Sequence, residues 1–319
     1  MIKKLHLVIL SAILFTMVLS LLSYSYIYTN KLGGKKLLTK VSNSFGTPLN
    51  RDIDGDGDGD NDSAAIFHNI AGGNSSEYGE YLYVDSNGKI YITGYSSNGS
   101  NWDMYVIRLN SNGTLDNSFG NKGKVVFNNI AGGNGGDFGN CLYVDSNGKV
   151  YITGASYNGS NRDMYVIRLN SNGSVDNTFG SPLSRDINGD GTNDNAVVVN
   201  NIAGGNKGDY GNSLYVDSNG KVYVTGLSND GNYDDIYVIK LNNDGSFDNS
   251  FGHNGKAVFP NITIGSNRSG RLLHVDSNGK IYLTGVSEGV IKLNNDGSFD
   301  NSFNDIGSCL LYTSDAADE

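Results

Sequence analysis

The chain has 319 residues, of which 44 are Gly and only 3 are Pro, and its formal net charge is −10. A chain of this length can bury a substantial core. The Gly content, about twice the usual share, and the lack of long runs of helix formers favour turn-rich all-β structure. No Lys/Arg cluster lies beyond the first 40 residues, which argues against nucleic acid as a partner.

Residues 1–30 are predicted to lie outside the folded domain. MIKK is followed by the apolar run LHLVILSAILFTMVLSLL, which is the layout of an export signal. The run is long for a cleaved signal and nearly long enough to span a bilayer, so a cleaved signal peptide and an uncleaved anchor both stay open. We expect the chain to be exported, and to be secreted, periplasmic or at the cell surface. A membrane is a partner only through an uncleaved anchor.

One segment occurs four times along the chain. The copies are LYVDSNGKIYITG (82–94), LYVDSNGKVYITG (142–154), LYVDSNGKVYVTG (214–226) and LHVDSNGKIYLTG (273–285). The Val residues before DSNGK are 60, 72 and 59 positions apart. A period of this length indicates a repeat architecture.

Each period is predicted to contain four strands. LYVD and KIYITG flank the turn DSNG, in which Asn-Gly supplies the two positive-φ residues of a tight hairpin. A third strand such as DMYVIRLN follows, and KVVFNNI is a typical fourth strand. The third strand is apolar on both of its faces, as expected for a sheet covered on both sides. Its apolar residues are Met104 and Val106 on one face and Tyr105, Ile107 and Leu109 on the other.

These strands predict an all-β fold, a β-propeller of four-stranded antiparallel blades, with a β-solenoid as the second candidate. The blades are expected within residues 31–307, as copies near 82–130, 142–203, 214–262 and 272–306 after a partial copy at 38–70. The fourth copy runs from TGVS straight into EGVIKLN, so its blade should be clipped. We expect about four blades in an incomplete ring, whereas pairing of 64–70 with 289–294 would favour a closed ring of four.

Two stretches resemble repeats of known bacterial families. YGNSLYVDSNGKVYVTG (210–226) resembles the SBBP β-propeller repeat, and LNNDGSFDNSFGHNGKAV (241–258) resembles the delta-60 repeat. The resemblance implies an exported bacterial β-propeller. It supplies no general catalytic residues that could be carried over to this chain.

Two acidic segments are inserted at one equivalent hairpin in alternate copies. DIDGDGDGDND (52–62) and DINGDGTNDN (186–195) fit D-x-D-x-D-G-x-x-D, with one Asn in the second. Oxygen ligands at positions 1, 3, 5 and 9, a backbone carbonyl at position 7 and a Gly at position 6 can wrap one Ca²⁺ ion. The predicted ligands are Asp52, Asp54, Asp56, Asp58 and Asp60 in the first segment and Asp186, Asn188, Asp190, Thr192 and Asp194 in the second, with Asp58 and Thr192 offering carbonyls.

The twelfth position, where an EF-hand carries a bidentate Glu, is Ser63 in one segment and Val197 in the other. An EF-hand is therefore not expected. The pattern resembles the calcium loops of integrin α-chain propeller blades, which implies that the ninth-position Asp closes the site. We expect two calcium ions as cofactors, and the competing interpretation is two solvated acidic loops.

The repeated aspartates favour a structural role over catalysis, because an active site is normally built once. They are Asp116, Asp176, Asp248 and Asp300. The favoured function is therefore a non-catalytic, calcium-stabilised binding, adhesion or scaffold module for a protein or glycan ligand. The alternative is a fragment of a propeller hydrolase or lyase whose active site lies in missing blades. Residues 308–319 are expected to be a non-native cloning or assembly artefact, because CLLYTSDAADE resembles a translated sequencing adapter. The natural protein is therefore expected to be longer.

Overall fold

The computed structural model describes residues 45–49, 63–260, 268–286, 289–303 and 308–310. The chain forms two compact units, one of residues 1–66 and 112–114 and one of residues 67–111 and 115–319. In the first unit, β1 (Thr47–Pro48) pairs antiparallel with β2 (Ser63–Ala64). The Gly46 N–H of the same unit donates a hydrogen bond of 2.8 Å to the carbonyl of Asn112.

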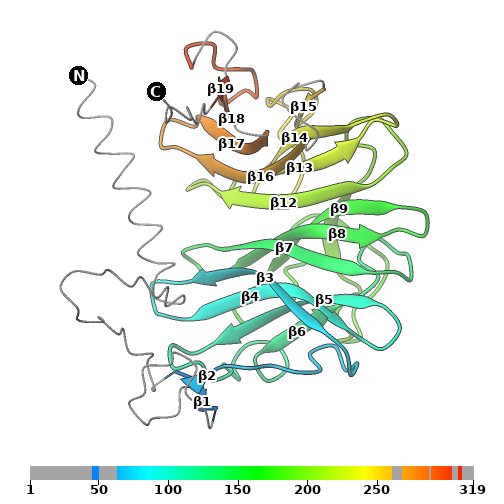
Figure 1. Ribbon diagram of the computed structural model, residues 1–319, viewed down its shortest axis with the longest axis vertical. Helices are drawn as coiled ribbons and strands as arrows, with labels where there is room; N and C mark the ends of the chain where they lie inside the picture. Colours follow the sequence, from blue (N-terminus) through cyan, green and yellow to red (C-terminus); the bar gives the residue numbers. More distant parts are fainter. Residues whose placement is uncertain (1–44, 50–62, 261–267, 287–288, 304–307, 311–319) are drawn as a thin grey trace, which may run out of the picture. The chain divides into compact units, whose positions relative to one another are not determined.

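The second unit is built from four antiparallel sheets, which correspond to the four copies of the repeat (Figure 1). Blade 1 contains β3 (Glu77–Val84), β4 (Ile90–Ser97), β5 (Trp102–Leu109) and β6 (Lys124–Phe127). Blade 2 contains β7 (Asp137–Val144), β8 (Val150–Tyr157), β9 (Arg162–Leu169) and β11 (Asn195–Val199), with β10 (Ser181–Pro182) paired to β11. Blade 3 contains β12 (Asp209–Val216), β13 (Val222–Asn229), β14 (Asp234–Leu241) and β15 (Lys256–Phe259). Blade 4 contains β16 (Arg268–Val275), β17 (Ile281–Val286), β18 (Gly289–Leu293) and β19 (Ser308–Leu310).

The prediction of an all-β fold with four-stranded antiparallel blades is confirmed. Consecutive blades pack on one another, and the first strand of each contacts the first strand of the next, in the order β3, β7, β12 and β16. Within the described ranges there is no helix long and apolar enough to cross a membrane. The predicted export segment, residues 1–30, lies outside those ranges.

The third strand of each blade lies in the core, because both of its faces are apolar. On β5, Met104 and Val106 are fully buried, and Tyr105 on the opposite face is 3% exposed. Met104 and Val106 belong to one apolar cluster with Leu142 and Ile152 of blade 2. Two further clusters join blade 2 to blade 3 and blade 3 to blade 4. Burial of apolar area between the blades is thus the main stabilising contribution of the repeat.

The DSNG turn forms at the predicted place, but its conformation differs from the expectation. In the described turns the positive φ belongs to the glycines, for example +74° at Gly88, and Asn87 is not among the positive-φ residues. The carboxylate of Asp85 accepts hydrogen bonds from the N–H groups of Asn87 and Lys89, both 2.9 Å. This Asx-type capping satisfies the turn without a second left-handed residue, so the expected pair of positive-φ residues was wrong.

The second and third strands of the fourth blade are shortened, as its missing loop predicts. Its β17 has 6 residues and its β18 has 5, where the equivalent strands of blade 3 have 8 each. Residues 308–310 pair with β18 as the fourth strand, so this place is taken by a segment other than residues 64–70. The strand pairing that would have favoured a closed ring of four blades is therefore not formed in the described residues.

The blade faces that would meet in a closed ring are open. Leu82 of blade 1 is 44% exposed, whereas Leu142 and Leu214, at the same position of blades 2 and 3, are 1% and 5% exposed. At the other end of the array, Leu272 of blade 4 is 61% exposed. These exposures agree with an incomplete propeller.

Candidate functional site

The first predicted calcium segment, with Asp52, Asp54, Asp56, Asp58 and Asp60, lies outside the described residues. The second segment connects β10 to β11 in blade 2. Two backbone hydrogen bonds close its base, from Leu183 N–H to the Asp194 carbonyl (2.9 Å) and from Asp194 N–H to the Arg185 carbonyl (3.0 Å). The segment therefore has a defined hairpin-like conformation.

The side chains of this loop turn inward onto its own backbone. The Asp186 carboxylate accepts the N–H groups of Gly189 (2.6 Å) and Gly191 (2.7 Å). Gly191 has a φ of +90°, which supports the sharp turn expected at position 6. Asp190 accepts the N–H and the hydroxyl of Thr192, at 2.9 Å and 2.6 Å. Asp186 and Asp190 thus both hydrogen-bond to the backbone between residues 189 and 192.

Asp194 differs from the other acids of the loop because it is buried, with 1% of its surface exposed. One carboxylate oxygen accepts the Ile187 N–H at 3.0 Å. The other oxygen, Oδ1, is buried without a hydrogen-bond partner in the described part of the chain. Burial raises the pKa of Asp194 above its ordinary value, and the charges of Asp190 and Asp186 raise it further against the hydrogen bond from Ile187.

Two residues that the sequence reasoning did not single out hold the loop in place. Ile187, between the first two predicted ligands, is 1% exposed and belongs to the core between blades 1 and 2. Its carbonyl accepts the N–H of Asn128 at 2.9 Å. Arg185 donates to the carbonyls of Asn129 (2.9 Å) and Ile130. Ile187 and Arg185 therefore both attach the loop to residues 128–130, which follow β6 of blade 1.

The loop meets part of what a calcium site requires. Within the described ranges, no three Asp, Glu, His or Cys side chains form a group ready to hold a metal. Oxygens that calcium prefers are present at the predicted spacing, and a buried carboxylate oxygen without a partner is the kind of atom that a cation satisfies. In this structure, however, the Asp186 and Asp190 carboxylates accept hydrogen bonds from the loop itself, from Gly189, Gly191 and Thr192.

A second cluster of charged residues recurs where one blade meets the next. In blade 2, Asp176 forms ion pairs with Lys149 and with Arg168, whose Nε lies 2.7 Å from Oδ2. Burial works to raise the pKa of Asp176, but hydrogen bonds from Lys149 and Thr178 and the charge of Arg168 outweigh it and hold the pKa below the ordinary value. The two ion pairs of Asp176 therefore connect it to Lys149, just before β8, and to Arg168, near the end of β9, within the blade.

At the first two junctions between blades, an arginine side chain links one blade to the next by hydrogen bonds. Arg168 donates to the carbonyl of Asn243 in blade 3 at 2.6 Å and to the Thr178 hydroxyl at 2.9 Å. Arg108 does the same from blade 1, to the carbonyl of Ser171 at 2.5 Å and to the Ser118 hydroxyl at 2.7 Å. The planar guanidinium group can serve several acceptors at once because it carries five N–H donors.

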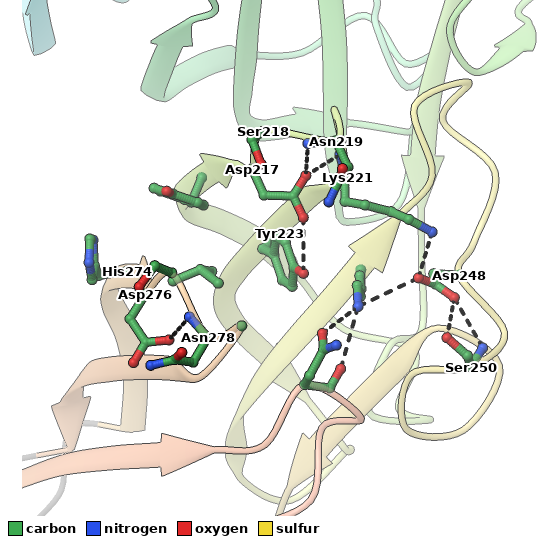
Figure 2. A pocket seen from close by; sticks show the side chains of 16 residues that line it. Asp217, Ser218, Asn219, Lys221, Tyr223, Asp248, Ser250, His274, Asp276 and Asn278 are labelled. Atoms are coloured by element: carbon green, nitrogen blue, oxygen red, sulfur yellow. Dashed lines mark hydrogen bonds and ion pairs between the residues drawn. The ribbon is translucent and has the colours of Figure 1, made fainter.

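The third junction, between blades 3 and 4, differs in its residues and is drawn in Figure 2. Lys240 replaces the arginine, and its Nζ lies 2.8 Å from Oδ1 of Asn295 and 3.6 Å from Asp248. A cavity of about 750 Å³ lies here, with Tyr215, His274 and Asp276 among its lining residues. A smaller cavity of about 330 Å³ is also lined by Lys240 and Asn295.

His274 is part of a row of rings across the blades. The rings of Tyr83 and Tyr143 have centroids 5.8 Å apart, and those of Tyr143 and Tyr215 are 6.0 Å apart. The row ends with His274, whose ring lies edge-on to Tyr215 at 5.6 Å. The sequence did not indicate that Lys240 and His274 line one cavity. Alignment of the copies shows only that each departs from the residue usual at its position.

Comparison with known families agrees with these blades. A family model described as a domain of unknown function (DUF5122) with a β-propeller fold matches residues 86–119, 146–179, 218–251 and 277–303. Each match runs from the DSNG turn of one blade through its third strand and ends at a phenylalanine, at Phe119, Phe179, Phe251 or Phe303. Comparison with the curated proteins gives no match.

Proposed function

We propose that this β-propeller repeat protein is an exported, non-catalytic binding module whose blades are stabilised by calcium. The four matches and the four sheets make it a repeat protein of the β-propeller type. The finer family assignment, to bacterial SBBP and delta-60 repeats, is part of the same proposal, because it rests on the stretches at 210–226 and 241–258.

The calcium part is carried by one observation, the buried Oδ1 of Asp194 without a hydrogen-bond partner. Leaving such an oxygen unsatisfied costs free energy, and a cation bound beside it would remove that cost. The same cation would reduce the repulsion that Asp186 and Asp190 exert on Asp194. Because Ile187 lies in the core between blades 1 and 2, an ordered loop would also support that junction.

The binding part is supported by the regular repetition of the blades and by the apolar segment at residues 5–22. Export gives the chain access to surfaces outside the cytoplasm. The recurring acids are used in ion pairs that join strands within a blade, which favours a scaffold over an enzyme. The ligand class proposed is a protein or a glycan.

Thermal unfolding of the full chain tests the calcium site. One site with calcium at about 100 times its dissociation constant adds about 2.7 kcal/mol of stability, which raises the melting temperature by about 5–10 °C for a domain of this size. We expect this rise with millimolar calcium, its loss with excess chelator, and a much smaller rise with magnesium.

Two variants make the test specific. Asp190→Ala should abolish the response of the described loop, and combination with Asp54→Ala should abolish the response of both segments. Asp234→Asn, at an exposed position at the start of β14, serves as the control and should respond like the unchanged chain. Identical melting curves with calcium and with chelator would refute the calcium part of the proposal.

A further inference from the structure

The repeats provide an internal reference for each junction between blades. At the first two junctions, the guanidinium groups of Arg108 and Arg168 reach a carbonyl of the next blade and a hydroxyl of their own. They also lie over aromatic rings, for example Arg168 at 4.7 Å from the ring centroid of Phe179. The guanidinium groups thus lie between the two blades at each of these junctions.

Two departures from the repeat coincide at the third junction. The ammonium group of Lys240 reaches the equivalent carbonyl, of Asn295, at the longer distance of 3.4 Å, and it has three donors where a planar guanidinium has five. His274 takes the place that Tyr83, Tyr143 and Tyr215 hold in the other blades. The cavity of about 750 Å³ is lined by both Lys240 and His274. Lysine also stands at this position in blade 4, as Lys292, but a histidine in place of the tyrosine occurs only at residue 274 among the four copies, so the third junction alone combines the two departures.

The cavity carries hydrogen-bonding groups with free capacity. Oδ1 of Asp217 and of Asp276 each caps the turn of its own blade. Among the described residues, Oδ2 accepts only a long hydrogen bond from a tyrosine hydroxyl, 3.5 Å from Tyr223 to Asp217 and 3.3 Å from Tyr282 to Asp276. Figure 2 shows Asp217 and Tyr223 on the blade 3 side and His274 and Asp276 on the blade 4 side.

The charges of the lining restrict the ligand. Three carboxylates, of Asp217, Asp248 and Asp276, face two ammonium groups, of Lys221 and Lys240, which disfavours a phosphate or another anion. The two ammonium groups disfavour a cation in turn. The polar lining disfavours an apolar ligand, because its hydrogen-bonding groups would lose water without gaining a partner.

We propose that the cavity between blades 3 and 4 binds a neutral sugar residue of a glycan. Vicinal hydroxyl groups can donate to the free carboxylate oxygens of Asp217 and Asp276 and accept from Lys240, while the rings of Tyr215 and His274 offer apolar surface for the C–H groups of the sugar. Pockets with aromatic side chains and a few convergent polar groups are typical small-ligand sites. This inference rests on the proposed binding function and assigns it a site and a ligand class.

Calorimetric titration of the full chain with maltohexaose, cellohexaose and chitohexaose tests the proposal. At least one of these neutral oligosaccharides should bind with saturation. The variant Lys240→Arg, combined with His274→Tyr (the filled variant), should narrow the cavity with two larger side chains and weaken binding about tenfold or more, the effect of losing a hydrogen bond to a charged group. Because the change copies the arrangement of blades 1 and 2, it should not lower the melting temperature.

Lys292→Arg is the matched control, since Lys292 occupies the same repeat position in blade 4 and pairs with Asp300 at 3.1 Å without lining the cavity. It should bind like the unchanged chain. Absence of binding for all three sugars, or equal binding by the filled variant, would overturn the inference. The melting temperature of the filled variant should still rise with calcium, whether or not a sugar binds. This measurement therefore tests the calcium proposal separately from the sugar proposal.

Discussion

The hydroxyl of Tyr165 on β9 donates a hydrogen bond of 2.8 Å to the carbonyl of Phe138 on β7, across the intervening strand β8. The bond can form because β8 carries Gly154 at this point. A Cβ atom on Gly154 would lie 1.8 Å from the Phe138 carbonyl oxygen and 2.9 Å from the Tyr165 hydroxyl. The same bond joins Tyr237 to Tyr210 in blade 3, at 2.9 Å.

Gly154→Ala is therefore expected to lower the free energy of unfolding by about 3 kcal/mol or more, since the new methyl group must displace backbone and break a buried hydrogen bond. Urea unfolding followed by circular dichroism measures the loss. Gly79→Ala is the control, because a Cβ there meets its nearest atoms at 3.6 Å. A loss in Gly154→Ala no larger than that in Gly79→Ala would show that this close approach is unimportant.

The open face of blade 1 provides a second matched pair. Leu142→Ala removes a side chain that is 1% exposed in the core between blades 1 and 2, and it should cost about 2–5 kcal/mol of unfolding free energy. Leu82→Ala, at the same repeat position, removes a side chain that is 44% exposed, and should cost less than about 1 kcal/mol. Chemical denaturation of both variants checks the difference, and equal losses would mean that the face at Leu82 is covered in solution.

A buried carboxylate gives the blades a pH dependence. Asp137 is 1% exposed and accepts the N–H groups of Asn129 (2.9 Å) and Ile130 (3.3 Å). Burial raises the pKa of Asp137 to about 7 in the folded chain, against hydrogen bonds from Ser156 and the two backbone groups. The folded state thus keeps a proton that the unfolded state releases near pH 4.

This linkage lowers stability as the pH rises from about 4 to about 7. Asp137→Asn should remove that contribution, so the variant should lose less stability than the unchanged chain between about pH 5 and pH 8, by on the order of 2 kcal/mol. Unfolding free energies at the two pH values measure the difference. The same slope in both proteins would show that the carboxylate is ionised in the fold throughout this range.

The blades were predictable because their signal is local and repeated. The segment around DSNGK fixes a hairpin, and the apolar third strand, such as residues 102–109, indicates a sheet covered on both faces. The turn conformation was not predictable from Asn-Gly alone, because the Asp85 carboxylate stabilises the turn with a single left-handed residue, Gly88. Local propensity does not include this side-chain cap.

The candidate sites were only partly predictable. The spacing of acids between residues 186 and 194 indicates calcium ligands, but only the structure shows that Asp194 Oδ1 is buried and that Ile187 enters the core. The cavity was missed because Lys240 and His274 are far apart in the sequence and belong to different copies. Neither substitution by itself indicates a binding site, and only the fold shows that both lie at one junction.

The four blades form a row in which each packs on the next, and this arrangement affects how the structure is lost. Stability in such arrays is approximately a sum of contributions from single repeats and from neighbouring pairs. Blades 2 and 3 share cores with two neighbours, so their strands should exchange amide protons last. Blade 4 is joined through the junction with the cavity, where a lysine replaces the arginine, so unfolding should begin there and a ligand in that cavity would delay the first step.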